Sequence, residues 1–156
     1  MKNEQDHADV ITYPPIIYLI AFAISWLLNY FFPLIVPLPR IVSAITGILF
    51  IIIAAVIAFA ASKQLEKAKT NIVPYKPTTA IVSTGIYAFS RNPIYLALTS
   101  LFLGANFLIN NLWGLFLLIP LVLFVQVGII MREERYLERK FGDEYLRYKA
   151  RVRRWL

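Results

Sequence analysis

Four long apolar stretches constrain the fold of this chain more than any other feature. They cover residues 13–36, 41–61, 93–109 and 112–131. A helix of about 20 apolar residues crosses a bilayer, and within the bilayer a helix satisfies its own backbone hydrogen bonds. The sequence therefore predicts an all-α integral membrane protein with four transmembrane helices.

Three polar segments accompany these stretches. Residues 1–12 form a short N-terminal tail, and residues 62–92 form a loop whose interleaved apolar residues predict an ordered excursion on the membrane face. In residues 132–156 apolar and aromatic side chains recur every three or four positions, which predicts an amphipathic helix that Gly142 bends or breaks. We expect residues 13–156 to form a single domain.

The distribution of positive charge predicts the orientation in the membrane. The chain has 16 Lys and Arg against 9 Asp and Glu. With four spans, 15 of the 16 cations fall in the three polar segments, and only Arg40 lies on the opposite side. The positive-inside rule then places both termini and the loop in the cytoplasm. The basic surplus serves orientation and contact with anionic membrane lipids rather than nucleic acid.

The composition also excludes several kinds of site. There is no cysteine, and the one histidine, His7, lies in the polar tail. These counts exclude disulfides, thiolate metal sites, histidine-rich metal sites and a cysteine nucleophile. We therefore predict no metal.

A candidate anion site precedes the third apolar stretch. Pro93 suits the first helical position, and Asn92 suits the N-cap before it. Arg91 then lies beside a helix N-terminus, where free N–H groups and the helix dipole favour an anion. A simpler interpretation is that Arg91 anchors the helix at the membrane surface.

A pair of acidic residues, Glu133 and Glu134, follows the fourth stretch. Neither has a cation three or four positions away, so a salt bridge within the helix does not explain them. Glu134 also lies on the apolar stripe, so it should find a partner outside its own helix. The candidates are Arg91, a lysine of the loop or a cationic ligand.

Several tyrosines lie in or beside the polar segments. An interfacial aromatic belt explains most of them, and stacking or a cation–π contact would suit one or two. They are Tyr75, Tyr87, Tyr95, Tyr136, Tyr145 and Tyr148.

In combination these motifs resemble the superfamily of isoprenylcysteine carboxyl methyltransferase and phosphatidylethanolamine N-methyltransferase. That family shows Arg-His-Pro-x-Tyr-x-Gly, then a Glu-Glu pair, then Phe-Gly-x-x-Tyr-x-x-Tyr. The resemblance covers roughly residues 45–156. It rests on Arg-Asn-Pro-Ile-Tyr-Leu-Ala at 91–97, Glu-Glu at 133–134, Phe-Gly-Asp-Glu-Tyr-Leu-Arg-Tyr at 141–148, Thr-Asn-Ile-Val-Pro at 70–74 and Val-Ser-Thr-Gly-Ile-Tyr at 82–87.

The resemblance implies a membrane methyltransferase with a cytoplasmic S-adenosylmethionine pocket and a lipid-like or small hydrophobic acceptor that enters from the lipid side. Arg91 would hold the cofactor's carboxylate, and Glu133 or Glu134 its amine or ribose. We expect Arg91 and Glu134 to be the catalytic residues. The implied cofactor residues are Val82, Gly85, Tyr87, Arg91, Asn92, Pro93, Tyr95, Glu133 and Glu134.

Two positions depart from the family pattern. Asn92 replaces the usual histidine, and Ala97 replaces the glycine. Asparagine keeps the hydrogen-bonding capacity but cannot act as a base near neutral pH.

Two other functions fit the same architecture. One is a sterol-reductase-like oxidoreductase that uses NADPH, which an additional phosphate-binding basic cluster would favour. The other is a small tetraspan binding or scaffold protein without enzyme activity, which would have no pocket behind Arg91 and Glu134.

Overall fold

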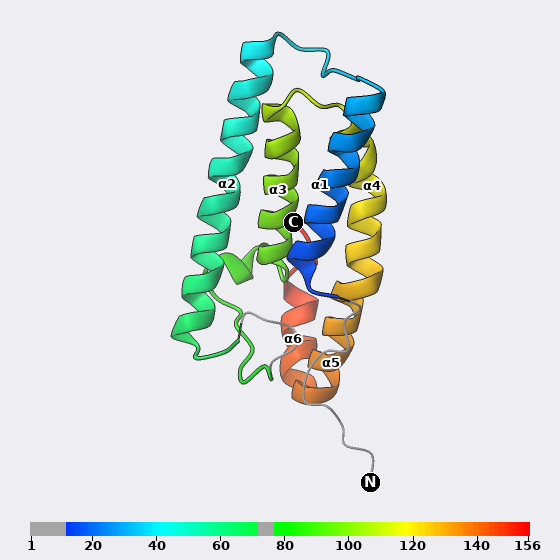
Figure 1. The fold of residues 1–156 in the computed structure, drawn as a ribbon. Helices are drawn as coiled ribbons and strands as arrows, with labels where there is room; N and C mark the ends of the chain where they lie inside the picture. Colours follow the sequence, from blue (N-terminus) through cyan, green and yellow to red (C-terminus); the bar gives the residue numbers. More distant parts are fainter. Residues whose placement is uncertain (1–11, 72–76) are drawn as a thin grey trace.

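The computed structural model describes residues 12–71 and 77–156, and these residues form a bundle of helices without a β-strand (Figure 1). The predicted all-α class is confirmed. In chain order the elements are α1 (Pro14–Phe31), α2 (Arg40–Lys67), the 3-10 turn η1 (Gly85–Ala88), α3 (Pro93–Leu108), α4 (Trp113–Val125), the π-helical turn η2 (Gln126–Ile130), α5 (Met131–Phe141) and α6 (Asp143–Arg151).

Three helical stretches in the described part of the chain are long and apolar enough to cross a membrane. They are α1, α2 and the continuous run Trp113–Phe141, which joins α4, η2 and α5. The third predicted span is the shorter apolar helix α3, of 16 residues, which lies alongside the others in the bundle (Figure 1).

The first predicted span, residues 13–36, is longer than the helix that forms. Helix α1 ends at Phe31 because Pro33 disfavours a helical conformation in the residue before it. Beyond α1, Ile35 forms an isolated antiparallel bridge with Asn111.

The second predicted span and the loop also need a corrected boundary. The loop was expected to begin at residue 62, but α2 continues to Lys67. The added helical residues are stabilised by packing, because Leu65 is buried in a small cluster with Ala61 and Tyr87. This contact ties the end of α2 to the turn η1.

The fourth predicted span, residues 112–131, does not end where its apolar run ends. The helix passes through η2 into α5 and stops at Gly142, where φ is +52°. A positive φ of this kind favours glycine. The predicted break of the C-terminal helix at Gly142 is confirmed.

Helices α2 and α3 cross in close contact through two glycines. A Cβ on Gly47 would lie 2.7 Å from the backbone nitrogen of Leu108, and one on Gly104 would lie 2.8 Å from the carbonyl oxygen of Gly47. At the same crossing the hydroxyl of Ser100 donates to the carbonyl of Phe50 at 2.8 Å. Small residues permit this kind of approach between membrane helices.

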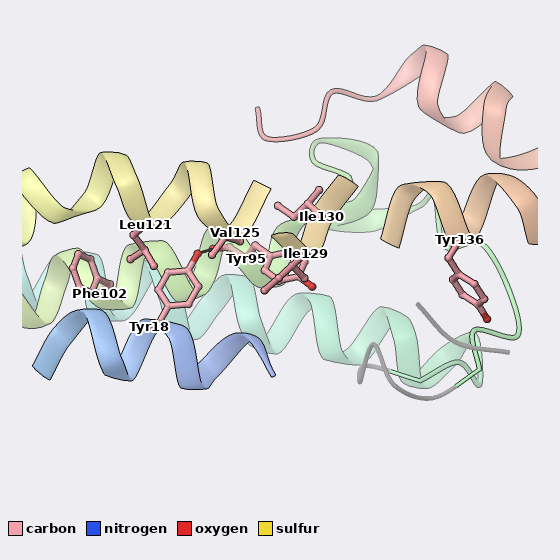
Figure 2. Close-up of a cluster of buried hydrophobic side chains, with 8 residues drawn as sticks. All are labelled: Tyr18, Tyr95, Phe102, Leu121, Val125, Ile129, Ile130 and Tyr136. Atoms are coloured by element: carbon pink, nitrogen blue, oxygen red, sulfur yellow. Dashed lines mark hydrogen bonds between the residues drawn. The ribbon is translucent and has the colours of Figure 1, made fainter. Parts of the chain in front are cut away.

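A buried apolar cluster joins α1, α3, α4, η2 and α5 (Figure 2). The ring of Tyr18 meets that of Phe102 edge-on at 6.5 Å, and its hydroxyl lies 2.8 Å from Thr99 Oγ1. The cluster fixes the start of α3 against α5, which carries the acidic pair. Its members are Tyr18, Tyr95, Phe102, Leu121, Val125, Ile129, Ile130 and Tyr136.

The segments predicted to share one side of the membrane gather at one end of the bundle. The start of α1, the end of α2, η1, the start of α3 and the pair α5–α6 all lie there (Figure 1). That this end faces the cytoplasm stays a prediction.

Candidate functional site

The site is built around the turn that opens α3. Pro93 occupies the first turn of the helix and Asn92 the N-cap position, as predicted. The Asn92 side chain does not cap the helix, however. Its Nδ2 donates to the carbonyl oxygen of Arg154 at 2.9 Å, and its backbone N–H donates to Ser90 Oγ at 3.1 Å. Asn92 therefore ties the start of α3 to the C-terminal segment.

Arg91 forms a buried ion pair with Glu134 of α5. Arg91 Nη2 lies 3.0 Å from Glu134 Oε1, and the two side chains are 7% and 6% exposed. Glu134 thus has a partner outside its own helix, and Arg91 was among the three candidates that the sequence indicated.

A second arginine, Arg154, contacts the same carboxylate. Its Nε donates to Glu134 Oε1 at 3.0 Å and its Nη2 to Oε2 at 2.7 Å, a bidentate arrangement. These hydrogen bonds raise the pKa of the Arg154 guanidinium. Sequence reasoning missed Arg154 because it counted the C-terminal cations only as orientation signals.

The three side chains leave part of Arg91 unsatisfied. Arg91 Nε and Nη1 are buried and have no hydrogen-bond partner in the described structure. Two guanidinium groups and one carboxylate also leave one net positive charge in the cluster. Buried polar groups are nearly always paired, and an unpaired buried charge is costly. Both features fit an anionic ligand beside Arg91.

Glu133 is in a different situation from Glu134. Its Oε2 accepts a hydrogen bond from the Tyr95 hydroxyl at 2.7 Å. An ionised carboxylate has two oxygens and about four acceptor sites. Glu133 is half-buried and accepts this one hydrogen bond in the described structure, so acceptor sites on its two oxygens stay available. In Glu134, by contrast, both oxygens already contact arginines.

A cavity of about 200 Å³ lies at this end of the bundle. The start of α1, the end of α2, the loop, α3, α5 and α6 all contribute to its wall. Eight of the nine predicted cofactor residues line it: Val82, Tyr87, Arg91, Asn92, Pro93, Tyr95, Glu133 and Glu134.

Gly85, the ninth, lies outside the cavity lining. Its φ is +61°, and a Cβ at this position would approach Gln64 Nε2 to 2.2 Å. The structure gives Gly85 a backbone role in the turn η1, which carries Tyr87 to the wall of the cavity.

The wall of the cavity has polar and apolar parts. Arg91 provides charge and Glu133 a carboxyl group, while Leu65, Ile94 and Leu98 provide an apolar surface that reaches the second turn of α3. A ligand that fits this wall has an anionic group and an apolar part.

Two tyrosines of α6 complete the wall, although the sequence favoured an interfacial role for most of the tyrosines. Tyr145 and Tyr148 are buried and line the cavity. The Tyr148 hydroxyl donates to the carbonyl of Tyr87 at 2.7 Å. Burial raises the pKa of Tyr87, Tyr145 and Tyr148 above the ordinary value, so all three are neutral phenols at neutral pH.

The C-terminal segment after α6 is fastened beside the cavity at both ends. The Arg91 backbone N–H donates to the carbonyl of Arg153 at 3.0 Å. Trp155 Nε1 donates to Gln126 Oε1 of η2 at 2.8 Å. Arg154 is therefore held between these two contacts.

One predicted motif is only partly visible. Thr70 and Asn71 line the cavity, but residues 72–74 of the same motif lie outside the described residues, as do Tyr75 and the polar tail up to residue 11. Among the described residues no group of three or more side chains has the make-up of a metal site.

Comparison with known proteins identifies the family. An uncharacterized protein of Haemophilus influenzae is 44% identical over 63 residues, which are 40% of this chain and the whole of that protein. No solved structure matches. The sequence model of the phospholipid methyltransferase family matches residues 42–144, more than half of the chain, and includes the loop, Arg91 and both glutamates. The chain belongs to the phospholipid methyltransferase family, within the superfamily of integral membrane methyltransferases.

Proposed function

We propose that this protein transfers a methyl group from S-adenosylmethionine to a lipid-like or small hydrophobic acceptor. The family supports methyl transfer in a membrane. The observation that carries the proposal is the pair of unpaired, buried N–H groups of Arg91 in the wall of the cavity. They suit the carboxylate of the cofactor's amino acid portion.

The residues around the cavity fit this cofactor. Arg91 would bind the carboxylate, and the spare acceptor capacity of Glu133 would bind the amine or the ribose hydroxyls. Tyr87, Tyr145 and Tyr148 would form walls for the rest of the molecule. When bound, S-adenosylmethionine supplies a methyl group on a positively charged sulfur.

The geometry shifts the proposed role of Glu134. Because both of its oxygens already accept from arginines, it would orient Arg91 rather than contact the cofactor's amine. The sequence left open whether Glu133 or Glu134 would bind the cofactor's amine or ribose, and we assign this contact to Glu133. Gly85 would act through the shape of η1 rather than by contact.

The apolar part of the wall supports the acceptor class. Leu65, Ile94 and Leu98 offer a surface for an acyl chain or another hydrophobic group. Methyl transfer depends on alignment of donor and acceptor and on exclusion of water, and a ligand seated in this cavity would be aligned by its wall. A carboxylate or thiolate acceptor would need no base, whereas a protonated amine would first lose a proton. Asn92 cannot serve as that base, and its side chain is engaged with Arg154.

The alternative functions fit less well. NADPH carries several phosphate groups, but Arg91 is the one Lys or Arg in the described lining of the cavity. A scaffold protein would have no pocket behind Arg91 and Glu134, yet both residues line this one.

Titration calorimetry of the detergent-purified protein tests the proposal. S-adenosylhomocysteine, the demethylated product, should bind saturably and be competed by S-adenosylmethionine, and NADPH should not compete. Radiolabelled methyl transfer to extracted lipids and to hydrophobic carboxylates, thiols and amines would then identify the acceptor. Folded protein that binds NADPH, or neither adenosyl compound, would overturn the proposal.

A further inference from the structure

Arg154 contacts the site from outside the cavity, through Glu134. It does not line the cavity, and its side chain is 30% exposed. Its side chain reaches the wall of the cavity through Glu134, whose Oε1 also contacts Arg91. The contacts of the Arg154 side chain with the cavity wall therefore run through this shared carboxylate.

The way in which the two arginines share Glu134 determines what Arg91 can do. Carboxylates commonly bind an arginine through two parallel hydrogen bonds. Arg154 holds that bidentate position, with Nε on Oε1 and Nη2 on Oε2. Arg91 is left with the single contact between its Nη2 and Oε1. Its Nε and Nη1 consequently stay unpaired.

The charge balance leads to the same conclusion. Without Arg154, Arg91 and Glu134 would form a neutral pair with little attraction for an anion. With Arg154 in place, Arg91, Arg154 and Glu134 together carry one net positive charge, which lies beside the carboxyl group of Glu133. A positive charge within about 4–6 Å of a carboxylate stabilises its ionised form. The positive charge of these side chains should therefore favour binding of a carboxylate.

We propose that Arg154 is a positioning residue that occupies Glu134 and thereby keeps Arg91 available for the carboxylate of the cofactor. The inference rests on the proposed function, because it takes the cofactor as the ligand. It assigns Asn92 a role as well. Asn92 and Ser90 both donate to the carbonyl of Arg154, so they hold in place the residue that frees Arg91.

Two adjacent arginines provide a matched test. Arg154→Gln removes the contact with Glu134, whereas Arg153→Gln changes an exposed side chain and keeps the backbone carbonyl that accepts from Arg91. Two probes separate positioning from general damage. S-adenosylhomocysteine carries the carboxylate, and methylthioadenosine lacks the amino acid portion.

We expect Arg154→Gln to weaken S-adenosylhomocysteine binding about tenfold to a hundredfold in calorimetry, the equivalent of a charged hydrogen bond. Binding of methylthioadenosine should match the parent. Arg153→Gln should match the parent for both probes. Arg154→Lys keeps the charge without the bidentate contact, so it should lose less affinity for S-adenosylhomocysteine than Arg154→Gln.

The outcomes distinguish this inference from the function on which it rests. If the parent binds neither probe, the proposed function fails first. If the parent binds but Arg154→Gln binds S-adenosylhomocysteine equally well, or loses both probes to the same extent, the positioning role is wrong. Should Arg154→Gln not fold, Arg154→Lys decides by the same comparison: an unequal loss of the two probes supports the inference, and an equal loss overturns it.

Discussion

Arg154 and Glu134, twenty positions apart, are joined by two hydrogen bonds of 2.7 and 3.0 Å. The link connects the end of the chain to the helix that follows the fourth apolar stretch. It makes Glu134 the centre of a buried ion-pair network rather than a free carboxylate. The stability and the binding properties of the site should therefore respond differently to changes in the two adjacent glutamates.

The first prediction concerns Glu134 and the stability of the ligand-free protein. Glu134→Gln removes the charge that two arginines share, and it leaves Arg91 buried without a counter-charge. Breaking a buried pair on one side costs about 3–5 kcal/mol. Chemical or thermal unfolding in detergent should show a loss of this size.

Glu138→Gln is the matched control for that loss. Glu138 lies on the same helix and pairs with Lys149 of α6, but both side chains are about a third exposed. Such a pair contributes about 1 kcal/mol or less. Equal losses of stability in the two variants would contradict a buried network around Glu134.

The second prediction concerns Arg91, whose loss should be milder for folding. In Arg91→Gln the Glu134 carboxylate stays paired with Arg154, so the free energy of unfolding should fall less than in Glu134→Gln. Cofactor affinity should fall about tenfold to a hundredfold, because the charged donors in the cavity are gone. The double variant should cost less stability than the sum of the two single variants. Strict additivity would show that the two residues do not interact.

The third prediction concerns topology. The positive-inside rule places the C-terminal segment in the cytoplasm and the turn at Asn110-Asn111 on the other side. A reporter active only in the cytoplasm should work when fused after Leu156 and fail when inserted at the turn. A reporter active only outside the cytoplasm should give the reverse pattern, and the same result at both positions would refute the predicted orientation.

Sequence reasoning predicted the helices better than their ends. Apolar length locates a membrane helix, but it says nothing of where helical hydrogen bonding stops. Helix α1 stops early because Pro33 intervenes, and α2 runs late because Leu65 finds apolar partners in the loop. The break at Gly142 was predictable because glycine acts locally, through its own backbone.

The candidate site was predicted in part, for a related reason. Motifs before α3 and after the fourth apolar stretch pointed to residues that do line one cavity. Arg154 lies in a run of cations with no spacing that sets it apart, and beyond the residues that match the family. Its role depends on the turn after α6, which no pattern in the sequence specifies.

The last prediction concerns Glu133 and separates the roles of the two glutamates. Glu133 accepts a hydrogen bond from Tyr95, and the amide oxygen of a glutamine can accept the same bond. Glu133→Gln should therefore change the free energy of unfolding of the ligand-free protein little, in contrast to Glu134→Gln. A cofactor amine or ribose would lose a carboxyl acceptor, and the loss of a hydrogen bond that involves a charged group costs about 1.5–3 kcal/mol, or roughly a tenfold to hundredfold loss of affinity. Calorimetry with S-adenosylhomocysteine measures this loss, and methylthioadenosine shows which part of the ligand Glu133 contacts.

A loss confined to S-adenosylhomocysteine indicates the amine, and an equal loss with both compounds indicates the ribose. Parent-level binding of both compounds to Glu133→Gln would remove Glu133 from the site.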